Sequence, residues 1–154
     1  MLFTNGIDWC TTMQLAPIES LKGQIAKPWT GAADPARPFG RQEPIADWRG
    51  SITGVDADTG AVRWKYQSPT PIVAGVTTTA GGLLFSGDLT GAALALDAAS
   101  GQLLWRNDTG QPIGGGVVSY AANGRQRIAV AAGMKSVIWP VNADSARIIV
   151  YGLP

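Results

Sequence analysis

The chain has 154 residues, of which 45% are apolar and 15% charged, and its 12 Lys and Arg nearly balance its 11 Asp and Glu. A net charge of +1 argues against a surface for nucleic acid or anionic membranes, because such surfaces need a basic excess. Histidine is absent and Cys10 is the only cysteine, which excludes from this chain Ser-His-Asp and Cys-His catalysis, His-ligated zinc, haem attachment through C-x-x-C-H and an internal disulfide.

Residues 1–50 predict one strand followed by an irregular segment. The strand runs from Phe3 to Trp9 and leads into a loop. Residues 27–44 then carry the turn-forming residues Pro28, Gly31, Pro35, Pro38, Gly40 and Pro44. Residues 1–15 lack the basic and apolar segments of a signal peptide, and no apolar run approaches the roughly 18 residues of a membrane span. As written, the sequence predicts a soluble chain without an export signal.

The remainder of the chain repeats itself with a period of 41 residues. The segment VDADTGAVRW at residues 55–64 recurs as LDAASGQLLW at residues 96–105. The same offset relates Pro71-Ile72 to Pro112-Ile113 and Gly75-Val76 to Gly116-Val117. Because two separate stretches match at one offset, the sequence predicts a repeated structural unit.

A unit of about 40 residues is the size that four short strands with tight turns require. In the turn of each copy, an Asp side chain is expected to accept backbone N–H bonds, and Gly60 or Gly101 to supply a positive φ. Trp64 and Trp105 fall in the returning strands, where an indole can cover an adjacent sheet and direct its N–H at a carbonyl. Strands are predicted at Ile52–Val55, Val62–Gln67, Ala74–Thr79, Leu83–Ser86, Ala92–Leu96, Leu103–Asn107, Gly116–Ala121, Arg127–Ala132 and residues 146–151.

Units of this kind bury one face on a neighbour and form a propeller or a linear stack. Residues 50–154 hold about two and a half units, whereas a closed propeller needs at least four blades. The predicted fold class is therefore all-β, a partial propeller of about three blades. Its divisions are expected at residues 1–50 (strand and Pro-rich excursion), 51–91 and 92–132 (repeat units) and 133–154 (final loop and closing strand).

Residues 74–120, AGVTTTAGGLLFSGDLTGAALALDAASGQLLWRNDTGQPIGGGVVSY, resemble the C-terminal blades of the alcohol dehydrogenases that depend on pyrroloquinoline quinone (PQQ), the methanol and ethanol dehydrogenase-type quinoproteins. Residues 5–10, residues 124–133 and the terminal strand extend the likeness over essentially the whole chain. The D-A-[DA]-[TS]-G-x-x-x-W repeat is similar to the tryptophan-docking motif of this family, although other propellers share that motif. The resemblance implies that the chain is part of an eight-bladed propeller.

The resemblance also implies a function, the oxidation of an alcohol to an aldehyde with PQQ and Ca²⁺ as cofactors. It implies a periplasmic location, a cytochrome as electron acceptor and the remaining propeller blades as partners. In this family the catalytic aspartate, the calcium ligands and most quinone contacts lie in earlier blades, so we expect no catalytic residue and no metal ligand here. The polypeptide alone is expected to be inactive, and its open sheet edges are expected to associate with the other blades or to oligomerise.

Four residues match family positions at or near the quinone. Val73 and Ala74 belong to the loop of residues 72–75, where many members carry Trp or Asn in place of Val73, so that a stacking or hydrogen-bonding contact would become apolar. Trp139 matches a Trp near the cofactor in the final loop, and Asn5 lies near an Asn that touches the quinone. These four residues are the candidate cofactor contacts.

A second class of function stays open. The same repeat occurs in non-catalytic propellers, such as the quinoprotein-repeat scaffold proteins of the bacterial outer-membrane assembly machinery. Under this hypothesis the chain serves as an interaction surface. It then needs no catalytic carboxylates, either of its own or from other blades.

Overall fold

The structure, a computed structural model, describes residues 1–23, 26, 31–34, 36–37, 40–136, 138–141 and 143–152. Three prolines of the predicted irregular segment, Pro28, Pro35 and Pro38, and the last two residues of the predicted final segment lie outside the described residues. The chain forms two compact units, one of Met1–Asp8 with Arg49–Pro154 and the other of Trp9–Trp48. No helix among the described residues has both the length and the apolar character that crossing a membrane demands.

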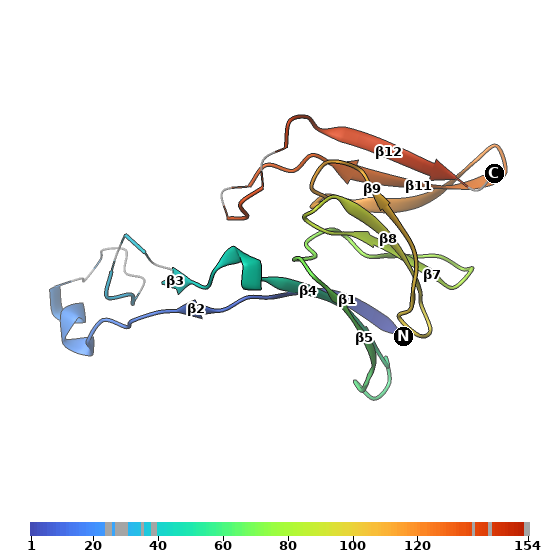
Figure 1. Ribbon diagram of the computed structural model, residues 1–154. Coiled ribbons are helices and arrows are strands. Elements are labelled where there is room, and N and C mark those ends of the chain that lie inside the picture. The colour runs from blue at the N-terminus through green and yellow to red at the C-terminus, as the bar shows by residue number, and fades with distance from the viewer. Residues whose placement is uncertain are drawn as a thin grey trace. The chain divides into compact units, whose positions relative to one another are not determined.

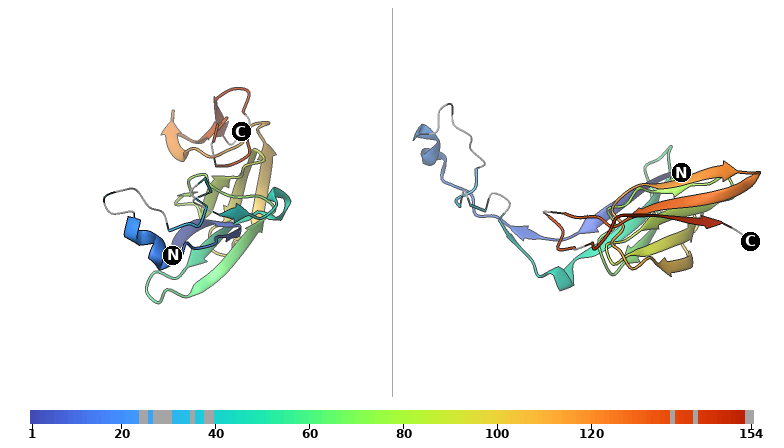
Figure 2. Two further views of the ribbon diagram at one scale, coloured as in Figure 1. Left: turned by 90° about the vertical axis from the view of Figure 1, so that its left-hand side faces the viewer. Right: turned by 90° about the horizontal axis from the view of Figure 1, so that it is seen from above.

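Three antiparallel sheets make up the larger unit (Figure 1). The first sheet has the order β1 (Leu2–Asp8), β4 (Arg49–Val55) and β5 (Val62–Ser68). The central sheet is a meander of β6 (Thr77–Thr78), β7 (Leu83–Gly87), β8 (Ala92–Asp97) and β9 (Leu103–Asp108). The last sheet contains β10 (Val117–Ala122), β11 (Arg125–Ala132) and β12 (Arg147–Gly152). The central sheet lies between the other two in Figure 1 and in the left view of Figure 2, and the predicted all-β class is confirmed.

Two apolar cores separate the three sheets. The core between the first and central sheets contains Ile52, Ile72, Leu84, Ala92, Leu94 and Leu96. The core between the central and last sheets contains Ala74, Ala93, Ile113, Val117, Ile128, Val130 and Ala132. Because side chains alternate along a strand, β8 sends neighbouring residues into different cores. This two-sided burial explains why β8 has an almost continuous apolar sequence.

The two copies of the repeat form the same hairpin turn in the first and central sheets. The Oδ1 of Asp56 accepts the backbone N–H groups of residues 58 and 59 at 3.2 and 2.9 Å. The Oδ1 of Asp97 accepts those of residues 99 and 100 at 3.0 and 2.7 Å. Gly60 and Gly101 adopt φ values of 72° and 74°. The turn chemistry that the sequence predicts is therefore confirmed in both copies.

One turn also carries an ion pair. Arg63 Nη2 lies 2.7 Å from Asp56 Oδ2. Its hydrogen bond, together with those from Thr59, lowers the pKa of the Asp56 carboxyl to about 2. In the second copy, hydrogen bonds from the Ser100 hydroxyl and backbone lower the pKa of Asp97. The carboxylate form is thus favoured in both turns.

The indole of Trp64 in β5 reaches across to the central sheet. Its N–H donates to the Ala98 carbonyl at 3.2 Å, and its ring covers Gly101, where an added Cβ would lie 2.4 Å from Cε3. Trp105, at the same place in the second copy, is 38% exposed and packs edge-on against Tyr151 of the last sheet, with ring centroids 5.0 Å apart. The two indoles therefore meet their neighbouring sheets in different ways.

Strand β6 is shorter than the sequence predicts. The sequence analysis places a strand at Ala74–Thr79, but only Thr77 and Thr78 pair with β7. The carbonyl of Ala74 accepts a hydrogen bond from the Asn5 side chain, and the N–H of Gly75 donates to Gly115. Because these backbone groups bond outside the sheet, the residues before Thr77 form a loop instead.

The smaller unit, Trp9–Trp48, is mostly irregular. It contains the short pair β2 (Thr11–Thr12) and β3 (Arg41–Gln42) and the 3-10 helices η1 (Ile18–Gly23) and η2 (Ile45–Asp47). The rings of Trp9 and Trp48 pack edge-on at 5.2 Å, and the Trp48 indole N–H donates to the Glu43 carbonyl at 3.1 Å.

Candidate functional site

Two connections between sheets frame the candidate site, and the first of them carries two of the four residues matched to quinone contacts, Val73 and Ala74. Residues 69–76 link β5 to β6, and residues 109–116 link β9 to β10. We call these segments the first loop and the second loop. They meet where the Gly75 N–H donates to the Gly115 carbonyl at 3.1 Å. A backbone hydrogen bond thus joins the two repeated loops directly.

The β7–β8 turn ties both loops to the central sheet. The Leu89 N–H donates to the Pro71 carbonyl of the first loop at 3.2 Å. The Ile113 N–H of the second loop donates to the Asp88 carbonyl at 3.0 Å. A turn of a few residues therefore fixes the relative position of the two loops.

Asp88 shapes that turn from a fully buried position. Its Oδ1 accepts hydrogen bonds from the Thr90 N–H (3.0 Å), the Thr90 hydroxyl (2.6 Å) and the Ala92 N–H (3.0 Å). Arg106 Nη2 lies 3.7 Å from Asp88 Oδ2, which has no hydrogen-bond partner among the described residues. The sequence analysis did not single out Asp88, although the S-G-D-L-T-G segment resembles the Asp-containing turns of the repeat.

Tyr66 faces the same interface from the first sheet. Burial raises the pKa of its phenol, the Arg106 charge opposes this rise and the Asp88 charge adds to it. The interface between the first and central sheets is therefore polar at this point, although its core is aliphatic.

The structure brings three of the four candidate residues together. The Asn5 side chain of β1 donates to the Ile72 and Ala74 carbonyls at 3.1 and 3.0 Å. These two carbonyls flank Val73, so Asn5 lies beside this residue. Ala74 is fully buried, whereas Val73 is partly exposed. Trp139 lies in the final loop, where the Ser136 hydroxyl accepts its backbone N–H at 3.0 Å. A quinone contact of any of the four stays a prediction.

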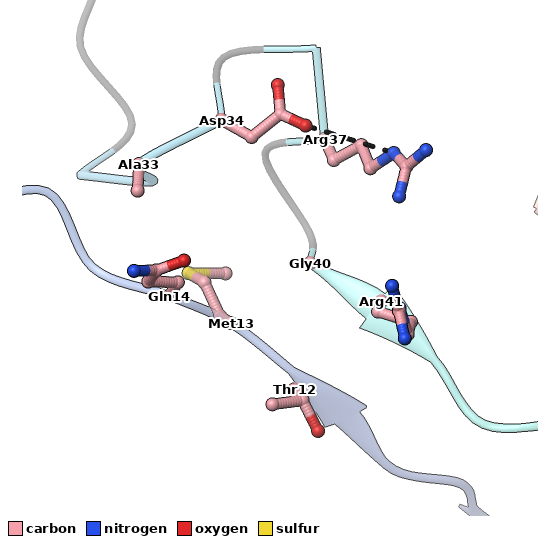
Figure 3. A pocket seen from close by; sticks show the side chains of 8 residues that line it. All are labelled: Thr12, Met13, Gln14, Ala33, Asp34, Arg37, Gly40 and Arg41. Carbon is pink, nitrogen blue, oxygen red and sulfur yellow. Dashed lines mark ion pairs between the residues drawn. The ribbon is translucent and has the colours of Figure 1, made fainter.

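Two hollows lie apart from these loops. One is an apolar groove of 570 Å³ between the central and last sheets, lined by Leu83, Phe85, Ala95, Leu104, Trp105, Gln126, Ile128, Tyr151 and Gly152. The other, of 480 Å³, belongs to the smaller unit and is lined by the eight residues labelled in Figure 3. There Arg37 pairs with Asp34 at 3.8 Å, and both side chains are more than half exposed. An exposed pair of this kind contributes little to stability.

The part of the chain that the structure describes holds no group of three or more His, Cys, Asp or Glu residues that could bind a metal ion. Calcium sites use about six to eight oxygen ligands, usually including several carboxylates. The described residues therefore do not supply a calcium site.

Comparison with known proteins now defines the family. The PQQ_2 family, described as outer membrane protein assembly factor BamB, matches residues 49–149. This chain belongs to the PQQ_2 family. A comparison with curated proteins gave no match.

Three solved structures resemble this PQQ_2 chain. The quinohemoprotein alcohol dehydrogenase ADHIIG from Pseudomonas putida HK5 is 26% identical, with a TM-score of 0.54, over 58% of this chain and 13% of its own. A europium-containing methanol dehydrogenase is 29% identical, with a TM-score of 0.54, over 62% and 16%. The quinohemoprotein alcohol dehydrogenase from Comamonas testosteroni is 30% identical, with a TM-score of 0.53, over 58% and 13%. The PQQ_2 chain thus spans a small part of each relative, consistent with the predicted C-terminal portion of such an enzyme.

Proposed function

We propose that this chain is the C-terminal part of a PQQ-dependent alcohol dehydrogenase and that it supplies one wall of the quinone site. The observation that carries the proposal is the meeting of the two repeated loops at Gly75 and Gly115, beside the partly exposed Val73. Identities of 26 to 30% to three quinoprotein dehydrogenases support it. In this proposal the enzyme works in the periplasm and passes its electrons to a cytochrome.

The loops suit the face of a flat ring system better than they suit a metal ion. The quinone supplies the oxidising power of the reaction when it is bound. Val73 offers it an apolar contact, and Gly75 is an exposed glycine that permits close approach of the backbone. Because the described residues hold no carboxylate cluster, the calcium ligands and the catalytic base belong to other segments of the enzyme in this proposal.

A fluorescence titration of the purified chain with PQQ tests the proposed wall. We expect saturable quenching of tryptophan fluorescence and at least tenfold weaker quinone binding in Val73→Asp, because a carboxylate would replace the apolar contact and repel the carboxylates of the quinone. Val118→Asp is the matched control, since Val118 is 53% exposed on β10. A dye-linked assay with ethanol, PQQ and Ca²⁺ should show no turnover. Absence of quenching would refute the proposed wall, and turnover by this chain would refute the absence of catalytic groups.

A second candidate is a non-catalytic interaction module. It is favoured by the edge strand β12, on which Ile148 is 70% exposed and Val150 51% exposed. Unpaired apolar edges of this kind promote association between chains. The module predicts self-association without quinone binding, and Ile148→Lys with Val150→Lys should then shift sedimentation towards a smaller species.

A further inference from the structure

Asn5 uses both of its side-chain hydrogens inside the protein. Its amide nitrogen donates to the Ile72 carbonyl at 3.1 Å and to the Ala74 carbonyl at 3.0 Å. A side-chain amide has two N–H donors and one carbonyl acceptor. Both donors are therefore committed to the first loop, and only the acceptor Oδ1 is left for any other contact.

In the second repeat unit a glycine, Gly87, occupies the place that Asn5 has in the first. Asn5 pairs with Ile52 of β4, and Gly87 pairs with Ala93 of β8, which lies 41 residues after Ile52. A Cβ added to Gly87 would lie 2.5 Å from Ile113 Cγ2, so the second loop packs directly on this glycine. The first loop instead contacts this strand position through the hydrogen bonds of the Asn5 amide.

The first loop depends on few other hydrogen bonds. Within the described part of the chain, the backbone hydrogen bonds that join it to neighbouring turns and loops are Leu89 N–H to Pro71 and Gly75 N–H to Gly115. The Asn5 side chain acts between these two points and fixes two carbonyls that lie on either side of Val73. Buried or partly buried carbonyls need such partners, because unpaired polar groups destabilise the conformation that contains them.

We infer that Asn5 is a positioning residue that sets the conformation of the first loop, rather than a hydrogen-bond donor to a cofactor. Asn5 lies near a family position that touches the quinone, but both of its amide hydrogens are already bonded to the first loop, which favours this different role. Asn5 acts in this way in the chain without any ligand. It rests on the proposed function only where it states that the wall offered to the quinone depends on Asn5.

Two variants and a control separate positioning from packing. Asn5→Asp keeps the shape of the side chain but turns a carboxylate towards two carbonyl oxygens, whereas Asn5→Ala only leaves those oxygens unpaired. Asn123→Asp makes the same change at another Asn-Gly pair, in the exposed β10–β11 turn. If packing alone mattered, Asn5→Ala would be the more harmful variant, but positioning by donation makes Asn5→Asp the more harmful one.

Amide hydrogen exchange of the ligand-free chain gives the primary measurement. The amide of Gly75 should exchange about tenfold faster in Asn5→Ala, and faster still in Asn5→Asp at neutral pH, because the loop opens more often. Exchange in β8, which lies in the centre of the sheet, and exchange in Asn123→Asp should match the wild type. Unchanged Gly75 exchange in both Asn5 variants would overturn the inference.

The pH dependence adds a signature that a packing defect would not produce. Below about pH 4 a carboxyl becomes protonated and regains one hydrogen to donate. Relative to the wild type at the same pH, Asn5→Asp should therefore recover part of its protection in acid, while Asn5→Ala should not. A lack of recovery, with Asn5→Asp no worse than Asn5→Ala, would show packing alone and refute the role of donation.

A parallel PQQ titration keeps the two proposals distinguishable. Faster exchange together with about tenfold weaker quinone binding in Asn5→Ala would support both the positioning role of Asn5 and the proposed wall. Faster exchange in a chain whose wild type binds no quinone would support the positioning role of Asn5 and refute the proposed function. Faster exchange with unchanged quinone affinity would overturn the claim that the wall depends on Asn5.

Discussion

Gly60 and Gly101 occupy the same place in two copies of one turn, but only Gly101 is covered by an indole. Their φ values are 72° and 74°, so an alanine at either position pays the same backbone strain, about 1–2 kcal/mol. A Cβ at Gly60 would meet nothing within 4 Å, whereas a Cβ at Gly101 would lie 2.4 Å from Trp64 Cε3. Overpacking of this kind costs a further ~1–3 kcal/mol. Gly101→Ala should therefore be the more destabilising substitution by that difference.

Urea denaturation followed by circular dichroism measures both free energies of unfolding. The double variant Trp64→Leu with Gly101→Ala completes a mutant cycle, because removing the indole should reduce the penalty at Gly101 to the value at Gly60. Equal destabilisation by Gly60→Ala and Gly101→Ala would refute the packing of Trp64 on the central sheet. A penalty at Gly101 that persists without the indole would refute its assignment to this contact.

Three further substitutions follow from the contacts of the sheets and turns. Asp88→Ala should lower the free energy of unfolding by about 2–4 kcal/mol in urea denaturation. Asp88→Asn should lower it by less, because the amide oxygen can still accept the backbone N–H groups of the turn. Equal destabilisation by the two variants would contradict this. Trp64→Phe should cost about 1 kcal/mol through the lost bond to Ala98, seen as a lower urea midpoint. The pKa of Asp56 is about 2 in the folded chain, below its ordinary 3.8, so its carboxylate stabilises the fold above about pH 4 and this contribution is lost between about pH 4 and 2. Asp56→Asn should flatten the acid limb of stability against pH, and an unchanged limb would contradict the role of this carboxyl.

Short sequence motifs and their period predict the sheets and turns of this fold. The Asp-to-Gly turn closes within five residues, so its donors, acceptor and positive φ all lie in one short motif. The 41-residue period then predicted paired sheets without any knowledge of their contacts. The apolar and β-branched character of residues 74–79 also predicts a strand at Ala74, which is wrong because the Ala74 carbonyl accepts from the side chain of Asn5 and not from the backbone of a neighbouring strand.

The site was less predictable because its contacts are distant in sequence. Asn5 and Ile72 are separated by 67 residues, and no periodicity indicates that one amide spans two carbonyls of a loop. Asp88 resembles Asp56 in its turn, yet the Asp56 side chain is 20% exposed and that of Asp88 is fully buried. That difference comes from the packing of neighbouring sheets, which a single turn sequence does not encode.

The two loops are shaped by the sheet that follows each of them. The first loop contains Pro71, whose carbonyl accepts the N–H of Leu89 from the central sheet at 3.2 Å. The second loop contains Pro112, whose carbonyl accepts the N–H of Gly133 from the end of the last sheet at 2.9 Å. Each loop is therefore stabilised in part by the sheet that follows it, since an unpaired loop carbonyl would otherwise need water. The wall that we propose for the quinone is for this reason a property of stacked sheets, and loop residues exchanged alone should not recreate it.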